Sequence, residues 1–276
     1  MPLSCFSLLL LLFPVYISMA VAQSAPTRNV LTRITIIQSE HGYGTAFSID
    51  VDQREYWITA KHILTGAKHP PYGSITAKTA TVRLLDSTSQ QERWLTAHFS
   101  VLDAGKDVDI VVLASSAPLL QNPLPSVKTT IEGTTLGDDC EFLGFPSATG
   151  SAWPINLGDG SPYFMPFVKH CFVSSLPLPG SPVFILDGVN NPGFSGGPVI
   201  YRTGPSQQII GVISGIVTEP AQVIPSLGGS KSVSKAKHAP KARIDANTGF
   251  IVAYTIDTAL DTIRKEPIGP LRPEAH

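Results

Sequence analysis

The amino-acid sequence predicts an all-β fold, and three observations support this prediction. Alternating runs rich in β-branched residues recur along the chain, as at residues 31–37 and 209–217. The 276 residues include 24 prolines and 23 glycines, which is typical of a chain with many turns. Stretches with the period of a long helix are few, so strands must supply most of the core.

The expected strands fall into two halves separated by a proline-rich connector at residues 115–130. In chain order they lie at residues 31–37, 42–47, 56–62, 81–85, 94–99 and 110–114, and then at 139–145, 168–174, 183–186, 209–217 and 249–254. The segment 218–248 breaks the β pattern with prolines, glycines and five basic residues. We expect a mobile surface insertion there, and a basic arm that binds a partner is the alternative.

The composition is typical of a globular protein, and its net charge does not indicate a charged binding partner. Hydrophobic residues make up 43% of the chain and charged residues 15%, which argues against disorder. The formal net charge of −1 gives no reason to expect binding to nucleic acid or to an anionic membrane. The seven histidines form no pair at metal-ligand spacing with a carboxylate, so we expect neither a metal nor a cofactor.

Residues 1–22 have the pattern of a secretory signal peptide. An apolar region is centred on residues 8–13, and Ala20-Val21-Ala22 is a small-x-small cleavage site. We therefore expect a secreted or periplasmic protein without stable membrane association after cleavage. No Lys or Arg precedes the apolar region, so an uncleaved membrane anchor is the alternative. Pro14 breaks the apolar run, and its short length also favours cleavage.

A candidate nucleophile lies in the segment Gly-Phe-Ser-Gly-Gly-Pro at residues 193–198. Glycines allow this loop to turn sharply and to present its amide N–H groups outward. The hydroxyl of Ser195 would attack a carbonyl carbon, and the amides of Gly193 and Ser195 would receive the oxyanion that forms. Serine alone is a poor nucleophile, so this hypothesis requires a histidine base and a carboxylate that orients it.

Two earlier segments contain a histidine and an acid in suitable contexts. His62 follows a β-type run that ends in Thr59-Ala60, and Asp109 directly precedes the unbroken apolar run 110–113. A carboxylate at the start of that strand could accept the imidazole Nδ1–H and fix the tautomer. Asp107 is the alternative acid, and we expect Asp109 because it alone adjoins the apolar run.

These motifs, Thr-Ala-x-His, Asp-Ile-x-x-Leu and Gly-x-Ser-Gly-Gly-Pro, occur in this order in the chymotrypsin-fold, or trypsin-like, serine peptidases. The chain resembles their bacterial branch, which includes the HtrA proteases, from about residue 42 to residue 265. The resemblance implies one peptidase domain over residues 23–276, built from two six-stranded antiparallel β-barrels with the catalytic residues His62, Asp109 and Ser195 at their junction. The first barrel would span about residues 30–114 and the second about 131–265.

The end of the chain also resembles that family. A strand is followed by a short helix at residues 258–265, which Asp257 is expected to cap. This ending is similar to that of HtrA protease domains, and we expect no PDZ domain after it. Phe194 stands where digestive relatives have an acid that pairs with a newly freed N-terminus. Activation through that salt bridge is therefore not expected here.

The resemblance also indicates how a substrate would bind. Ser214, Gly215 and Ile216 match the family strand that runs beside the substrate, and its edge would pair with the substrate backbone. Val189 matches the floor of the primary specificity pocket, and Ile216 would narrow its wall. We expect a small uncharged pocket that favours Val, Ala or Leu, while Asp187 is the alternative floor residue.

Two cysteines, Cys140 and Cys171, remain after removal of the signal peptide, and both lie in strand-like runs. An even number of cysteines in an exported chain permits a disulfide. Two separate buried thiols are the alternative, because the sequence does not give the distance between the two Cα atoms.

We therefore expect an exported serine endopeptidase that hydrolyses protein or peptide substrates. The main alternative is a catalytically inactive binding or scaffold protein that retains the trypsin-like fold. An esterase on another fold is less consistent with the order His, Asp, Ser, because in the α/β-hydrolases the serine comes first.

Overall fold

A computed structural model of the chain describes residues 26–86, 93–120, 125–146, 153–156, 162–203, 206–222 and 243–272. The expected signal peptide lies outside these residues. Within them, fifteen strands and three short helices confirm the all-β prediction. No helix in the described ranges is both long enough and apolar enough to span a membrane.

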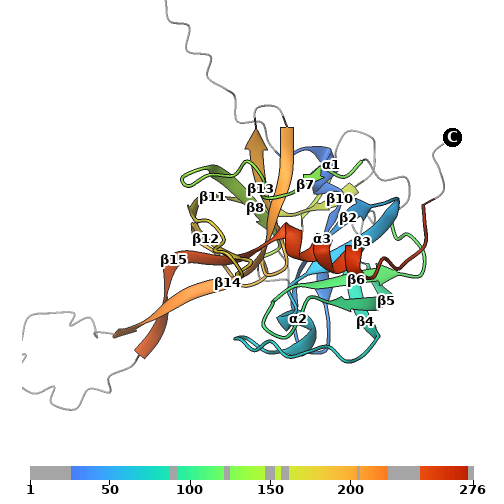
Figure 1. The fold of residues 1–276 in the computed structure, drawn as a ribbon, viewed down its shortest axis with the longest axis horizontal. Helices are drawn as coiled ribbons and strands as arrows, with labels where there is room; N and C mark the ends of the chain where they lie inside the picture. Colours follow the sequence, from blue (N-terminus) through green and yellow to red (C-terminus); the bar gives the residue numbers. More distant parts are fainter. Residues whose placement is uncertain are drawn as a thin grey trace, which may run out of the picture.

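Six antiparallel strands close the first barrel in the order β1-β2-β3-β6-β5-β4 (Figure 1). The alternation of side chains sends Trp57 of β3 into one apolar cluster and its neighbours Tyr56 and Ile58 into another. The first barrel therefore has a core of its own and a second apolar face available for packing. Its strands are β1 (Ile34–Gln38), β2 (Tyr43–Val51), β3 (Arg54–Thr59), β4 (Thr79–Leu85), β5 (Trp94–Asp103) and β6 (Val111–Ser115).

The second barrel closes through the order β13-β8-β11-β12-β15-β14, because β14 also pairs with β13. Its strands are β8 (Asp139–Gly144), β11 (Phe167–Ser175), β12 (Val183–Asp187), β13 (Pro198–Thr203), β14 (Ser206–Gln222) and β15 (Arg243–Thr255). Strand β7 (Lys128–Thr129) adds to β14 in parallel, and β9 (Trp153–Asn156) pairs with β10 (Pro162–Met165) in a separate two-stranded sheet. Two closed six-stranded barrels thus confirm the expected architecture.

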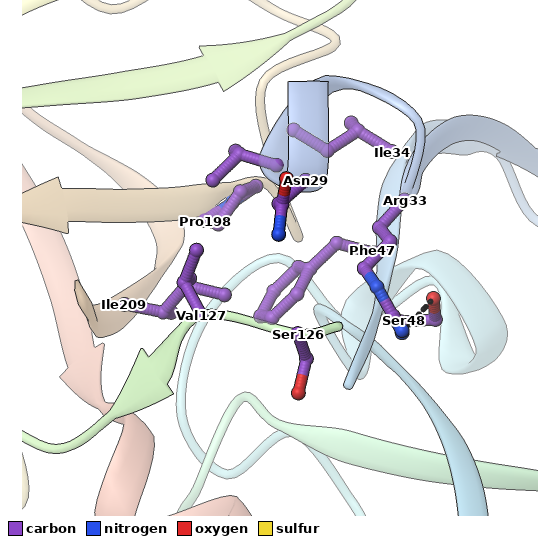
Figure 2. Close-up of a pocket in the computed structure, with 10 residues that line it drawn as sticks. Asn29, Arg33, Ile34, Phe47, Ser48, Ser126, Val127, Pro198 and Ile209 are labelled. Carbon is purple, nitrogen blue, oxygen red and sulfur yellow. Dashed lines mark hydrogen bonds between the residues drawn. The ribbon is translucent and has the colours of Figure 1, made fainter. Parts of the chain in front are cut away.

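The two barrels share an apolar core. A small void of about 10 Å³ lies between them, and Figure 2 shows Phe47 of the first barrel facing Val127 and Ile209 across it. This volume holds about one water molecule, so the barrels are closely packed here. Helix α1 (Arg28–Leu31) also borders the void and buries Val30. The expected strand at 31–37 therefore begins only at Ile34, because its first residue belongs to this helix.

The C-terminal helix α3 (Ile256–Lys265) buries an apolar face in the shared core. Its N-cap is Thr255, which directly ends β15, so the helix starts earlier than expected. The prediction that Asp257 caps the helix is wrong, because this residue lies inside the first turn. Its Oδ2 instead accepts a long hydrogen bond of 3.5 Å from the amide of Ile131.

Strands β14 and β15 continue beyond the barrel as a two-stranded arm (Figure 1). Antiparallel pairing runs from Thr218 opposite Asn247 to Gln222 opposite Arg243. The expected insertion at 218–248 is therefore strand at both of its ends, while residues 223–242 lie outside the described residues. Pro220 lies opposite Asp245 within this pairing, and proline is tolerated on edge strands such as these.

Candidate active site

The candidate catalytic residues come from three chain segments that meet where the barrels join. His62 is the first residue of helix α2 (His62–Thr65) and follows β3 after two residues. Asp109 precedes β6, which pairs with β3 through Thr59 and Val111. This pairing brings the end of β3 and the start of β6 together, so His62 and Asp109 become neighbours.

The Asp109 carboxylate is fully buried and receives three hydrogen bonds. Its Oδ2 lies 2.7 Å from Nδ1 of His62 and accepts the hydroxyl proton of Ser214 at 2.5 Å. Its Oδ1 accepts the backbone N–H of His62 at 2.8 Å. A buried carboxylate needs such donors, because burial without partners would penalise its charged form. Asp107 is exposed, and the structure brings Asp109 rather than Asp107 to the imidazole.

The buried residue Lys61 connects the turn that contains His62 with the loop that contains Asp109. Lys61 has no exposed surface, and its ammonium pairs with Asp103 and donates to the carbonyl oxygen of Gly105. Its amide also lies 3.4 Å from the carbonyl oxygen of Asp109. Lys61 was not predicted as part of the site, because nothing in the sequence indicates that a lysine beside the histidine is buried.

Glycine allows the loop of Ser195 to pack closely against the first barrel. A Cβ atom on Gly196 would lie 2.1 Å from the carbonyl oxygen of Thr45 and 2.3 Å from Oγ1 of Thr59. Gly196 also has φ = +84°, a conformation that favours glycine. The carbonyl oxygen of Ser195 accepts the amide of Thr45 at 2.8 Å. These contacts hold the serine beside the end of β3, from which His62 follows.

The hydroxyl of Ser195 donates to the carbonyl oxygen of Ser214 at 3.0 Å. Among the described residues, this hydroxyl makes no hydrogen bond to His62. His62 and Asp109 are therefore in direct contact. Ser195 is linked to Asp109 through Ser214, whose carbonyl oxygen accepts from Ser195 and whose hydroxyl donates to Asp109.

The amides of Gly193 and Ser195 donate to no residue in the described part of the chain. The other side of this loop is fixed, because the carbonyl oxygen of Gly193 accepts the hydroxyl of Thr45 at 2.7 Å. Gly193 has φ = +106°, in the region that favours glycine. A fixed loop with two unpaired amides can receive a negatively charged oxygen without losing other hydrogen bonds.

The segment that was expected to bind substrate forms part of β14. Ser214 is buried, Ile216 is 36% exposed, and a Cβ atom on Gly215 would meet nothing within 4 Å. Pairing between β14 and β13 ends at Val212, and among the described strands only β15 pairs with the segment beyond Ile213. One edge of this segment is thus open for a further strand.

The expected pocket floor lies in a different hollow. Val189 is 62% exposed and lines an open depression of about 370 Å³ together with Lys169, His170, Phe172, Asp187 and Gly188. Neither Ser214 nor Ile216 lines this depression. The structure therefore does not bring the expected floor and wall together in one pocket.

Cys140 and Cys171 lie directly opposite each other on β8 and β11. Both are buried free thiols, and their Sγ atoms are 2.8 Å apart. Burial and the hydrogen bond from Cys140 raise the pKa of Cys171 well above its ordinary value. Within the described ranges, no group of three His, Cys, Asp or Glu side chains could hold a metal ion.

Comparisons with known proteins identify solved structures with a similar fold. No protein-family profile and no curated protein matches the chain. The HtrA-type protease AlgW, solved with a tripeptide, is similar at 18% identity with a TM-score of 0.50, covering 86% of this chain and 60% of that one. The serine endoprotease from Yersinia pestis has 16% identity and a TM-score of 0.48, covering 88% of this chain and 67% of that one. The Rv3671c protease of M. tuberculosis has 19% identity and a TM-score of 0.45, covering 84% and 88%.

The two closed barrels and the likeness to AlgW define the chymotrypsin fold. The resemblance to trypsin-like serine peptidases of the HtrA type is thereby confirmed at the level of the fold. The chain spans about 60% of the length of the AlgW structure, so the likeness concerns that part alone.

Proposed function

We propose that the protein is an exported serine endopeptidase whose catalytic residues are His62, Asp109 and Ser195. The observation that carries this proposal is the fully buried Asp109 carboxylate, which lies 2.7 Å from Nδ1 of His62. That contact leaves the Nε2 atom of the imidazole as the acceptor, which is the state a general base needs.

The first chemical step joins the Ser195 oxygen to the substrate carbonyl carbon. In the resting protein this hydroxyl donates to the carbonyl oxygen of Ser214. A substrate amide that donates to the same oxygen would compete for it, so that the hydroxyl turns towards Nε2 of His62. The new C–O bond then forms as the proton moves to Nε2, and Asp109 stabilises the resulting imidazolium.

The carbonyl oxygen of the substrate becomes an oxyanion in this step. The unpaired amides of Gly193 and Ser195 are the candidate donors, and their loop is already fixed by Thr45. As the intermediate collapses, Nε2 returns its proton to the leaving amine and the C–N bond breaks. Water then attacks the acyl-enzyme by the same route and releases the second product.

An extended peptide is the substrate that best suits the open edge of β14. Pairing with the backbone of Ser214 to Ile216 would align the scissile bond with Ser195 without requiring a particular side chain. We also propose that residues 1–22 direct export and are then removed, which the N-terminal sequence of the mature protein would test.

The test is hydrolysis of a fluorogenic protein such as labelled casein. We expect the wild-type chain to hydrolyse it, Ser195→Ala to lose essentially all activity, and Ser100→Ala on the exposed face of β5 to retain it. Circular dichroism would establish that all three chains are folded. An active Ser195→Ala variant would show that another residue is the nucleophile.

A further inference from the structure

Lys169 of β11 contacts three residues of the loop that precedes Ser195. Its ammonium nitrogen donates to the carbonyl oxygen of Val189 at 2.5 Å and to the side-chain oxygen of Asn191. The same nitrogen lies 5.5 Å from the centroid of the Phe194 ring. One side chain therefore reaches both ends of the loop 189–194, immediately before the candidate nucleophile.

The register of β11 explains how a lysine reaches this loop. Lys169, Cys171 and Val173 lie on the same face of the strand, and the last two are buried in the core of the second barrel. Lys169 is thus the inward-facing residue at one end of the strand, where the barrel opens. Burial lowers its pKa below the ordinary value for lysine, which agrees with an ammonium partly removed from water.

Phe194 is the residue through which these contacts would act on the site. It is fully buried, and its ring meets Phe142 edge-on at a centroid distance of 5.0 Å. Phe142 is also the residue that pairs with Lys169 across β8 and β11. The loop is therefore held from the barrel core by Phe142 and from the barrel opening by Lys169.

The position of Phe194 determines where the two unpaired amides lie, because it stands between Gly193 and Ser195. In the digestive enzymes that the sequence resembles, the residue at this position is an acid that pairs with a freed N-terminus. This chain has Phe194 there instead. The contacts of Lys169 join the same loop to a strand of the same barrel, and they require no cleavage of the chain.

We propose that Lys169 is a positioning residue that holds the loop 189–194 in the conformation in which the amides of Gly193 and Ser195 can stabilise the oxyanion. This proposal rests on the proposed peptidase function. Since the oxyanion forms only in the transition state and the intermediate, loss of the lysine should lower kcat and leave KM nearly unchanged.

The test compares Lys169→Met, Lys169→Arg and the control Lys128→Met in steady-state hydrolysis of a peptide substrate. Met keeps much of the length of the stem and removes the charge, Arg restores a cation, and Lys128 is exposed on β7 away from this loop. We expect kcat of Lys169→Met to fall by roughly 10- to 100-fold, less than the loss of about 10²–10³ caused by removing an oxyanion donor itself. KM should stay within about twofold, Arg should restore most of kcat, and the control should match the wild type.

A second variant keeps the proposal testable if Lys169→Met folds poorly. Asn191→Ala removes one acceptor of the ammonium from an exposed position, and it should lower kcat a few-fold in the wild type. In the Lys169→Met background it should add nothing, because the contact is already absent. A folded Lys169→Met variant with wild-type kcat, or with unchanged kcat and a raised KM, would overturn the positioning role alone. A wild-type chain without hydrolysis would overturn the proposed function together with it.

Discussion

Nδ1 of His62 lies 2.7 Å from Oδ2 of Asp109, whose carboxylate has no exposed surface. The pairing of β3 with β6 brings these residues together, and Ser214 supplies a further donor to the same oxygen. The orientation of the Asp109 carboxylate therefore depends on Ser214 as well as on the imidazole of His62.

Asp109→Asn should lower kcat by about 10⁴-fold, because an amide at this position favours the wrong imidazole tautomer. Asp107→Asn should stay within about twofold of the wild type, because Asp107 is exposed and, in the described part of the chain, contributes only its carbonyl oxygen, to the hydroxyl of Tyr254. Steady-state kinetics on one peptide substrate would measure both. Equal losses would show that Asp109 does not have the orienting role.

Asp257 gives a prediction for the dependence of stability on pH. Burial raises the pKa of this carboxyl group, so the folded state binds the proton more tightly than the unfolded state does. Stability from this group is then fully present below the unfolded pKa of about 3.9 and is lost as the pH rises through the raised folded value. Asp257→Asn, which is uncharged throughout, should have a higher Tm than the wild type at pH 7.

Thermal unfolding followed by circular dichroism would check this, and the gain in Tm should shrink as the pH is lowered towards 4. A lower Tm for the Asn variant at pH 7 would mean that the hydrogen bond from Ile131 and the favourable helix N-terminus outweigh the cost of burying the charge.

Cys140 and Cys171 are free thiols in this structure, with Sγ atoms 2.8 Å apart, and we predict that oxidation joins them as a disulfide in the exported protein. Residues directly opposite in an antiparallel ladder have Cα atoms about 4.5–5.5 Å apart, which is within the range that a disulfide can bridge. Counting thiols in denatured, non-reduced protein should give none, whereas reduction should release two. Two thiols before reduction would leave both residues as small members of the barrel core.

Cleavage of a peptide library is predicted to occur mainly after Val, Ala or Leu. Ile216 lies on the open edge of β14, where its bulk would restrict long substrate side chains, and a buried substrate Lys or Arg would need a carboxylate partner. Ile216→Gly should extend cleavage to Phe and Tyr, whereas Val189→Ala should leave the preference unchanged, because Val189 lines a different depression that Ile216 does not border. Dominant cleavage by the wild type after Arg or Lys would contradict an uncharged pocket and indicate Asp187.

The sequence was sufficient for the fold because the predicted strands contain most of the residues that fill the two barrels. It also identified His62 and Asp109 as neighbours, since each motif adjoins a strand and the two strands pair. It was not sufficient for the start of α3, because Thr255 ends a strand and begins a helix at the same residue. Strand and helix signals overlap at such a junction.

The features that could not be predicted depend on pairing between distant segments. The strands of the arm, near Thr218 and Asn247, pair because β14 and β15 resume their ladder beyond the barrel, after a register shift between Ile216 and Thr218. Lys169 is one lysine in an alternating strand, and its contact with Asn191 arises when the barrel closes. The alternation itself carried a signal, because Cys171 and Val173 mark the face of β11 on which Lys169 lies.

Labelling of the folded protein with a fluorophosphonate, followed by mass spectrometry of the labelled peptide, tests the central claim most directly. The account predicts one label per chain, located on Ser195, with labelling abolished in Ser195→Ala and strongly slowed in His62→Ala. A folded wild-type chain that takes no label, or that carries it on another residue, would contradict the account and favour a binding or scaffold protein that retains this fold.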